Sequence, residues 1–258
     1  MATAATIRRD RAHLRKTIGD RRYFSRYDER KSYAWGPEMA LWMQFGPFKQ
    51  ELWALRPTAA ASFHECEGFM REAAQVRRDM MRIRKLPKRP KESAFDRERR
   101  LNELWNDEEA YEKQVLRRAR SAAESLVFGL DSLAQSYAHQ LNLPQRYWVG
   151  GRPLSESVSL LEGIRAVANW QRHNYTESWR EYKESNWSHV VLKSIGLWHG
   201  GERLPQEFLS RLGCTTYAEL ENDYFEAVAY MMLEMGLTHS PDYQPDRWKN
   251  EDPKKAWR

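Results

Sequence analysis

The sequence predicts an all-α protein: a helical bundle with a long charged helical hairpin, a basic N-terminal arm and an extended C-terminal tail. Apolar residues recur at steps of three or four along most of the chain, which is the period of one helix face. The sequence contains no Asn-Gly or Asp-Gly turn and no alternating β-branched segment, so β-hairpins are not expected. Hydrophobic residues make up 41% of the 258 residues, which is enough for a sizeable core.

Composition divides the chain into three parts. Residues 1–34 are polar and rich in Arg, and we expect them to form a loose basic arm. Residues 35–236 carry the helical patterns and are predicted to form the bundle. Residues 237–258 contain three prolines and many charges, which favours an extended polar tail.

The first helical pattern begins at Pro37. Pro47 is predicted to break or restart it, because proline lacks the amide hydrogen that a helix interior needs. Thr58 is predicted to cap a second, long helix. The apolar positions that share one face of this helix are Phe63, Cys66, Met70, Ala73, Val76 and Met80. An internal linker over 86–93 follows, where two prolines interrupt the helical pattern.

The next helical pattern runs from residue 94 to about 141, with a break expected near Asn106-Asp107. Ser93 and Asp96 resemble a capping box at its start. The first half is so rich in charged residues that we expect it to stand in solvent and to form the projecting hairpin with the preceding helix. The following segment NLPQRYWVGGRP is predicted to be a loop, and its two glycines could approach a ligand closely or simply form a turn.

Ser155 is predicted to cap a helix over 155–184, and a helix capped by Thr216 and Glu219 follows two shorter ones. The helix over 155–184 has an apolar half and a polar stripe. On a helical wheel the stripe contains Glu162, Arg165, Asn169, Arg172, His173, Thr176 and Glu177. Asn and His are less common in a purely solvated stripe than Glu, Lys and Gln, which are better helix formers.

These side chains fit the needs of metal-independent RNA cleavage. His173 could act as general acid or base, since imidazole exchanges a proton near neutral pH, and Glu177 could orient its ring. Arg165 and Arg172 could hold a phosphate, and Asn169 could orient the phosphate or the ring. The alternative is structural, with Asn169 and His173 hydrogen-bonded to a neighbouring helix.

An Arg followed by four to six residues and a His, on a late helix of a bundle, is the signature of the HEPN superfamily, which the segment over 165–177 resembles. The resemblance covers about residues 110–236 and implies a dimeric, metal-independent ribonuclease of a toxin–antitoxin, CRISPR or phage-defence system. The spacing departs from the signature, because seven residues separate Arg165 from His173. Arg172 is adjacent to His173, so the identity of the catalytic Arg is open. Arg8 and His13 match the spacing within the basic arm.

The basic residues are clustered, and the formal net charge is +6. Clustered Arg with nearby aromatic residues fits a nucleic-acid partner, RNA rather than DNA, and a solvated basic surface that keeps the protein soluble explains the clusters equally well. The residues predicted to contact nucleic acid are Arg8, Arg9, Arg21, Arg22, Arg77, Arg78, Arg84, Lys85, Lys88 and Arg89. Trp35, Trp42 and Trp53 could stack on bases, although a place in the core or an interface is the commoner role.

No metal or cofactor is expected. The sequence lacks an E-x-x-H pair, a Walker motif and a dinucleotide-binding glycine motif. Two cysteines without C-x-x-C spacing predict free thiols and suit a reducing compartment. No apolar run reaches the roughly 20 residues of a membrane span, and the N-terminus has no signal sequence, so we expect a cytoplasmic protein without a membrane partner.

Two functional hypotheses follow. The first is an RNA-binding protein with metal-independent ribonuclease activity, of toxin or phage-defence type, that forms a homo-oligomer. The second is a non-enzymatic helical adaptor, a subunit of a nucleoprotein or defence complex that binds nucleic acid or a protein partner through its basic segments.

Overall fold

Every regular element of the described chain is helical, which confirms the predicted fold class. The computed structural model describes residues 37–174, 187–197 and 203–235. The elements are α3 (Pro37–Ile83), α4 (Ala94–Gln140), a 3-10 turn η2 (Gln145–Tyr147), α5 (Leu160–Asn174), α6 (Trp187–Ser194), α7 (Leu204–Leu212), α8 (Tyr217–Tyr230) and a π-helical turn η4 (Met231–Met235). The predicted arm over 1–34 and the predicted tail over 237–258 lie outside the described residues.

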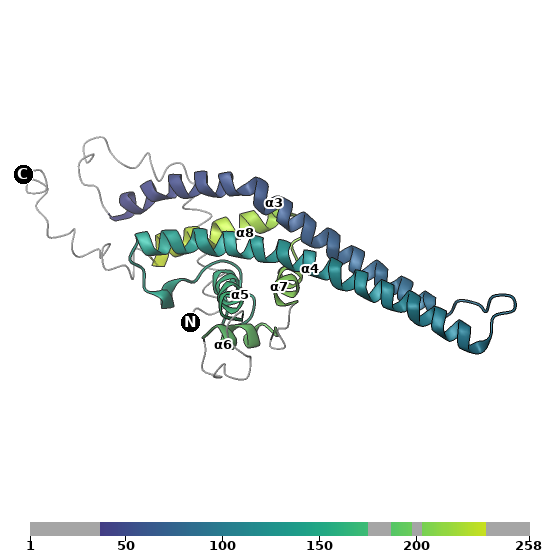
Figure 1. Cartoon of the computed structure of the whole chain (residues 1–258). Helices are drawn as coiled ribbons and strands as arrows, with labels where there is room; N and C mark the ends of the chain where they lie inside the picture. The colour runs from purple at the N-terminus through teal and green to yellow at the C-terminus, as the bar shows by residue number, and fades with distance from the viewer. Residues whose placement is uncertain (1–36, 175–186, 198–202, 236–258) are drawn as a thin grey trace, which may run out of the picture.

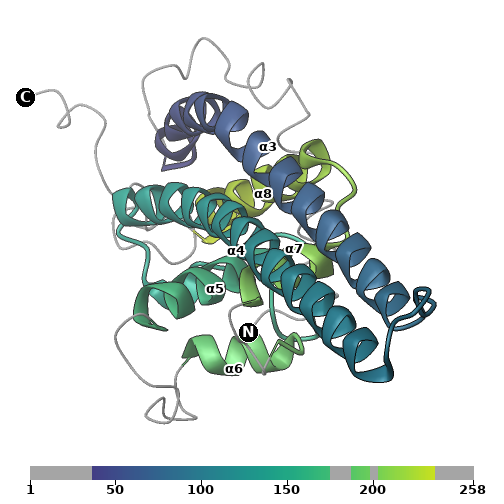
Figure 2. The same ribbon diagram turned by 45° about the vertical axis from the view of Figure 1, so that its right-hand side comes forward.

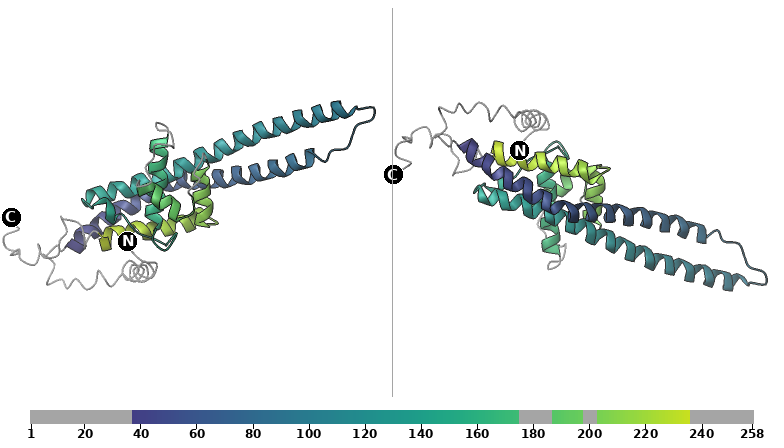
Figure 3. Two further views of the ribbon diagram at one scale, coloured as in Figure 1. Left: turned by 90° about the horizontal axis from the view of Figure 1, so that it is seen from below. Right: turned by 90° about the horizontal axis from the view of Figure 1, so that it is seen from above.

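The helices α3 and α4 pack antiparallel and form a hairpin much longer than the rest of the protein (Figure 1). The four shorter helices gather at one end of it. α8 lies against α3, while α5 and α7 lie against α4, and α6 packs on α5 (Figure 2). Figure 3 shows the other end of the hairpin projecting free of this body. The predicted hairpin and its linker are therefore present.

An aromatic cluster joins three helices in the body. The ring of Phe48 on α3 meets the ring of Tyr137 on α4 edge to face, with the centroids 5.2 Å apart. Tyr224 on α8 lies 6.4 Å from Phe48, and its hydroxyl donates a hydrogen bond of 2.6 Å to the carbonyl of Leu130 on α4. All three rings are buried. Aromatic pairs of this kind add about 1 kcal/mol each beyond the area they bury.

The projecting half of the hairpin has a much smaller core. Ala73, Val115 and Leu116 form a separate buried cluster, with Phe69 and Met70 packed against it. Farther out, polar contacts cross between the two helices. The hydroxyl of Tyr111 donates to Glu72, and Arg77 pairs with Glu112. Val76 and Met80, which lie nearer the tip on α3, are buried as well, so apolar packing and polar contacts together hold the two helices.

Two expected breaks do not occur. α3 continues through Pro47 and Pro57, so the predictions of a break at Pro47 and of a cap at Thr58 are wrong. Both prolines are exposed, and packing against α4 and α8 holds the helix, which bends rather than ends (Figure 1). α4 likewise continues through Asn106-Asp107, because helix-compatible charged residues and the contact with α3 support it there.

Two of the three predicted helix caps are present. Ser93 accepts a hydrogen bond of 3.0 Å from the amide of Asp96 at the start of α4, and Thr216 accepts one of 3.3 Å from the amide of Glu219 at the start of α8. The prediction that Ser155 caps the motif helix is wrong. Residues 154–158 form a tight loop, closed by a 2.8 Å hydrogen bond from the amide of Leu154 to the carbonyl of Val158.

The motif helix α5 therefore begins at Leu160 instead of 155. The side chain of Glu162 accepts hydrogen bonds of 2.8 Å from both the amide and the hydroxyl of Ser159, which places Ser159 in the capping position. The described part of the helix ends at Asn174, and the remainder of the predicted range, 175–184, lies outside the described residues.

The two glycines of the loop before α5 serve close packing against the body. A Cβ atom at Gly150 would lie 2.2 Å from the carbonyl oxygen of Ala227 on α8. Gly151 has a φ of +84°, and its Cβ would lie 2.7 Å from the Cβ of Ala227. The loop therefore crosses α8 at backbone contact. Of the two alternatives, a turn or an approach to a ligand, the turn accounts for both glycines.

Cys66 is buried, Cys214 is partly buried, and both are free thiols. Burial raises the pKa of the Cys66 thiol to about 11, so this thiol is not a nucleophile at neutral pH. Among the described helices, none combines the length and the apolar character needed to cross a membrane.

The close contact at Gly150 predicts a loss of stability on adding one methyl group. We expect Gly150→Ala to lower the free energy of unfolding by about 2 kcal/mol or more, because the methyl group would overlap backbone atoms of α8 that cannot move aside. The melting temperature should fall by about 5 °C, measured by circular dichroism.

Gly68→Ala is the matched control. A Cβ at Gly68 would meet nothing within 4 Å, and Gly68 lies inside α3. This variant should gain about 0.5–1 kcal/mol, since alanine is the better helix former. Equal stabilities for the two variants would contradict a close approach of the loop to α8.

Candidate nucleic-acid interface

The predicted polar stripe of α5 is buried at its N-terminal end and exposed at its C-terminal end. Glu162 and Arg165 are each only 8% exposed. Asn169 is partly buried, whereas Arg172 and His173 are exposed. Thr176 and Glu177 lie outside the described residues. The expectation that the helix presents its whole polar stripe was therefore only partly right, because the first turns of α5 are enclosed by neighbouring elements on both sides.

Arg165 is held between two indole rings. Its guanidinium carbon lies 4.3 Å from the centre of the Trp148 ring and 5.0 Å from the centre of the Trp187 ring. It also donates a hydrogen bond of 3.1 Å to the carbonyl of Gln145. Burial lowers the pKa of Arg165, and the nearby carboxylate of Asp131 opposes that shift. Arg165 thus joins α5 to the loop before it and to the start of α6.

Arg172 pairs with a buried acid. Its guanidinium lies 2.6 Å from a carboxylate oxygen of Asp131 on α4, and Asp131 is only 2% exposed. Arg172 also donates a hydrogen bond of 3.0 Å to the side-chain oxygen of Asn169. Gln135 donates a further hydrogen bond of 2.6 Å to Asp131. Burial raises the pKa of Asp131, and the hydrogen bond from Arg172 opposes that shift.

The structure thus brings Arg165, Asn169 and Arg172 together around Asp131, a residue that the sequence pattern did not single out. The positive charge of Arg172 is compensated at close range, and Arg165 is covered by aromatic rings. Both guanidinium groups already have partners within the fold. His173 lies exposed at the last turn of α5, one residue after Arg172, and it therefore does not share the environment of Arg165.

A strong concentration of positive charge lies at the tip of the hairpin. Residues 82–100, which we call the tip, contain nine Lys or Arg and three Asp or Glu. The net charge of this segment equals the +6 of the whole chain. The segment includes the end of α3, the predicted linker over 86–93 and the first two turns of α4.

Side chains from α4 form hydrogen bonds with the tip loop. Arg100 forms two hydrogen bonds with the carboxylate of Glu92, of 2.7 and 3.0 Å. Arg97 donates a hydrogen bond of 2.9 Å to the carbonyl of Leu86, and Arg100 donates one of 3.2 Å to the carbonyl of Pro87. The hydrogen bond from Arg100 lowers the pKa of Glu92 to about 2, so that its carboxylate is charged at neutral pH. The loop is therefore anchored at several points.

Five cations of this tip are exposed and form no ion pair among the described residues. They are Arg84, Lys85, Lys88, Arg89 and Lys91. Lys91 has a φ of +63°, a conformation that favours Gly or Asn over Lys. A lysine at such a position supplies charge at a conformational cost of about 1 kcal/mol.

A cavity of about 580 Å³ lies beside these cations, between the loop that follows α3 and the first turns of α4. Its charged lining residues are three cations, Arg84, Lys88 and Arg97, and one acid, Glu98, and Asn102 and Trp105 also line it. The guanidinium carbon of Arg84 lies 4.2 Å from the centre of the Trp105 ring. The Nε atom of Arg97 is buried there without a hydrogen-bond partner in the described structure. This combination of donors and an aromatic ring suits a phosphate with an adjoining base.

The remaining predicted contact residues lie in other settings. Arg77 pairs with Glu112 across the hairpin, and Arg78 donates to the side chain of Gln75, so both cations have partners. Arg8, Arg9, Arg21 and Arg22 lie outside the described residues. Sequence reasoning named four of the five unpaired cations and missed Lys91, which the linker prediction over 86–93 already contained. It also missed Trp105, because nothing in the sequence indicates which residues of α3 and α4 face each other.

No group of three or more His, Cys, Asp or Glu side chains comes together as a metal site within the described ranges. The HECE sequence over 64–67 illustrates why. Its residues point in different directions around α3, and Cys66 is buried while His64 and Glu65 are exposed.

If Arg165 joins elements of the fold, its removal should reduce stability. We expect Arg165→Ala to lower the free energy of unfolding by about 2 kcal/mol, because the variant lacks two cation–π interactions and one hydrogen bond. Urea denaturation measures this difference. Arg117→Ala, at an exposed position of α4, is the control and should change stability by less than about 0.5 kcal/mol. An Arg165→Ala protein as stable as the wild type would return Arg165 to the candidates for ligand binding.

The chain was compared with protein-family models, with curated protein sequences and with solved structures, and none of these comparisons gave a match. The resemblance to the HEPN superfamily therefore stays a prediction, and the function has to be argued from the geometry of the fold.

Proposed function

We propose that the protein binds nucleic acid through the tip of the α3–α4 hairpin and acts as a non-enzymatic helical subunit of a larger nucleoprotein assembly. One observation carries the proposal. Five exposed cations without ion-pair partners lie together at the end of a projecting hairpin. Such a cluster repels itself, and a polyphosphate backbone relieves that repulsion while releasing counterions.

The position of the cluster also supports the proposal. The tip projects from the body, so a rod-shaped polyanion can reach it from several directions without steric conflict (Figure 3). The loop is anchored by Arg97 and Arg100, which leaves the neighbouring cations arranged before any ligand arrives. A preorganised site loses less conformational entropy on binding than a flexible chain does.

RNA is the favoured nucleic acid. Phe95, at the start of α4, is 73% exposed among the cations of the tip. Proteins recognise RNA largely at loops and ends, where unpaired bases stack on aromatic side chains and on guanidinium planes. Phe95 and the Arg84–Trp105 pair offer both kinds of surface, whereas duplex DNA would leave the exposed ring unused.

A non-enzymatic role accounts for the α5 stripe. Arg172 is neutralised by Asp131, and Arg165 lies between two tryptophans. Neither could bind a phosphate without first giving up its present contacts. The stripe in this interpretation fixes α5 to α4, to the preceding loop and to α6.

Metal-independent RNA cleavage is a second candidate, favoured by one observation. Arg172 and His173 are adjacent and both exposed at the last turn of α5. In a homodimer, two such turns could face each other and form one composite site. His173 would then be the general acid or base and Arg172 a phosphate ligand, with the pair to Asp131 exchanged for one to the substrate.

Removing the unpaired cations of the tip should weaken RNA binding strongly. We expect the fourfold variant Lys85→Gln, Lys88→Gln, Arg89→Gln, Lys91→Gln to lose most of the affinity for a 20-nucleotide RNA, measured by fluorescence anisotropy. The slope of log K against log salt concentration should become shallower by about 0.7 for each phosphate group that the variant no longer neutralises.

A charge-matched control separates local from general effects. The variant Arg71→Gln, Arg117→Gln, Arg146→Gln, Arg203→Gln removes four exposed cations away from the tip, and it should keep most of the affinity. Equal losses in the two variants, or an unchanged salt slope in the tip variant, would contradict binding at the tip. Replacing Arg8, Arg9, Arg21 and Arg22 by Gln in the same assay tests the N-terminal part of the sequence hypothesis.

The two candidate functions make different predictions for His173→Ala. We expect the wild type not to cleave RNA in the presence of EDTA, and His173→Ala to bind RNA with unchanged affinity, because no phosphate contact passes through this residue. His139→Ala, at another exposed histidine, is the control. EDTA-resistant cleavage by the wild type that falls about 100-fold or more in His173→Ala would replace the leading proposal by the second candidate.

A further inference from the structure

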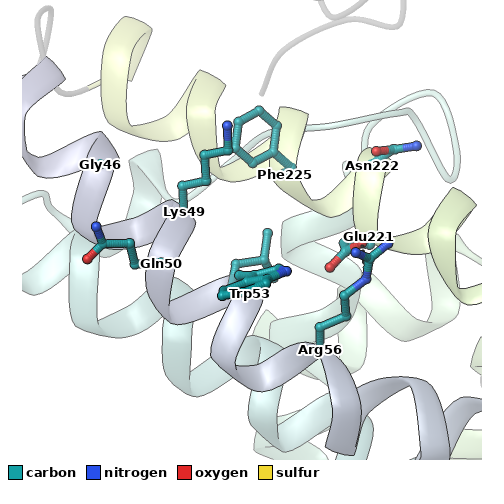
Figure 4. Close-up of a pocket in the computed structure, with 9 residues that line it drawn as sticks. Gly46, Lys49, Gln50, Trp53, Arg56, Glu221, Asn222 and Phe225 are labelled. Carbon is teal, nitrogen blue, oxygen red and sulfur yellow. Dashed lines mark ion pairs between the residues drawn. The ribbon is translucent and has the colours of Figure 1, made fainter.

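A second aromatic and basic surface lies far from the tip, where α3 and α8 face each other in the body. The groove there has a volume of about 700 Å³ (Figure 4). Its lining residues on α3 are Gly46, Lys49, Gln50, Leu52, Trp53 and Arg56, and those on α8 are Glu221, Asn222 and Phe225. This volume is within the range of sites that enclose a small organic ligand.

Trp53 stands in the middle of this groove and is 71% exposed. Figure 4 shows it between Lys49 and Gln50 on one side and Arg56 and Glu221 on the other. Phe225 lies on the facing helix and is stacked on the buried ring of Phe48, with the centroids 5.9 Å apart. The wall of the groove is thus fixed by the aromatic cluster of the core, while the indole of Trp53 remains uncovered.

The charges of the groove favour an anion. Glu221 is the acid that lines it, and Arg56 neutralises this carboxylate at 3.2 Å. Lys49 makes no ion pair within the described structure, so the groove carries one uncompensated positive charge. The side-chain amides of Gln50 and Asn222 add hydrogen-bond donors and acceptors on opposite walls.

We propose that this groove binds an unpaired nucleotide of single-stranded RNA. The base stacks on Trp53, the amides of Gln50 and Asn222 meet its polar edge, and Lys49 contacts a phosphate. The inference rests on the proposed function, since it names a second contact site for the same class of ligand. Base pairing would hide the base within a helix stack, so a duplex cannot use this groove in the same way.

The groove and the tip are separate sites. Trp53 lies on α3 and Arg84 directly follows the last residue of that helix, Ile83, so the two are 31 residues apart, which corresponds to about 47 Å of helix. A tetranucleotide bound in the groove is too short to reach the tip. A longer RNA can occupy both, whereas a tetranucleotide occupies one site at a time, and its binding at the groove is identified by its dependence on Trp53.

The test measures binding of fluorescently labelled tetraadenylate to the full chain. We expect Trp53→Ala to weaken this binding about 5- to 150-fold, because the indole on which the base stacks is absent. Trp53→Phe keeps a ring and should retain binding within a few-fold. Lys49→Gln should weaken binding and reduce the salt dependence by about one phosphate contact, whereas Arg117→Gln, an exposed cation of α4 outside the groove, should do neither.

The fourfold tip variant separates the two proposals. In this variant the Trp53-dependent binding of tetraadenylate should remain as in the wild type, although the variant loses affinity for the 20-nucleotide RNA. If Trp53→Ala leaves tetraadenylate binding unchanged, the groove proposal is wrong, while tip-dependent binding of the longer RNA would still stand. A wild type that binds neither RNA overturns both proposals.

Three further results would also overturn the groove proposal. Duplex RNA of equal length that depends equally on Trp53 would exclude recognition of an unpaired base. AMP that binds as tightly as tetraadenylate would make a free mononucleotide the ligand. A dimer that dissociates in Trp53→Ala, with tetraadenylate binding unchanged, would assign the groove to a second copy of the chain. Circular dichroism of each variant verifies that these exposed substitutions leave the fold intact.

Discussion

The contact of Phe48 with Tyr137 and Tyr224 holds the body of the protein together, and the positions of both candidate sites depend on it. It joins α3, α4 and α8 at one point. Because α3 and α4 are fixed to each other there, they emerge side by side and continue as a hairpin. Because α8 is fixed to α3 at the same point, the groove around Trp53 has two rigid walls. A loosened cluster would therefore alter the groove directly and the hairpin through its base.

Cations in the body and cations at the tip differ in how they are paired with acids. In the body, some cations have acidic partners: Arg172 is paired with Asp131, and Arg56 with Glu221. At the tip of the hairpin, cations outnumber carboxylates, and five cations form no ion pair in the described structure. Asp131 shows the cost of the opposite arrangement, because a buried carboxylate is tolerated only with charged and polar groups directed at it. Part of the surplus of cations therefore lies at the tip, where few acids are available to pair with them.

The periodicity of apolar residues was sufficient to predict the helical class, the hairpin and the caps at Ser93 and Thr216. It failed where tertiary packing overrides local preference. Proline signals a break in a short helix, but Pro47 lies in a long one that neighbouring helices support. Ser155 has the right residue type for a cap, yet the loop closes in such a way that Ser159 takes this position.

The candidate sites were predictable to a smaller extent. Clustered Arg and Lys identified most of the tip, because charge is additive along a sequence and needs no knowledge of contacts. The helical wheel correctly placed Arg165 and Arg172 on the same side of α5. The wheel could not show that Trp148 and Trp187 contact Arg165, or that Asp131 pairs with Arg172. These partners come from other elements of the fold. The exposure of Trp53 likewise depends on how α8 packs beside α3, which no local pattern encodes.

The length of the hairpin has an electrostatic consequence. At physiological ionic strength the Debye length is about 8 Å, whereas about 45 Å of helix separates Trp53 from Ile83, the last residue of α3 before the cations of the tip. Mobile ions therefore screen the potential of the tip almost completely before it reaches the body. A ligand bound at one end therefore does not change the affinity at the other end by electrostatics. Any coupling between the two sites has to pass mechanically along the paired helices or through a ligand that contacts both.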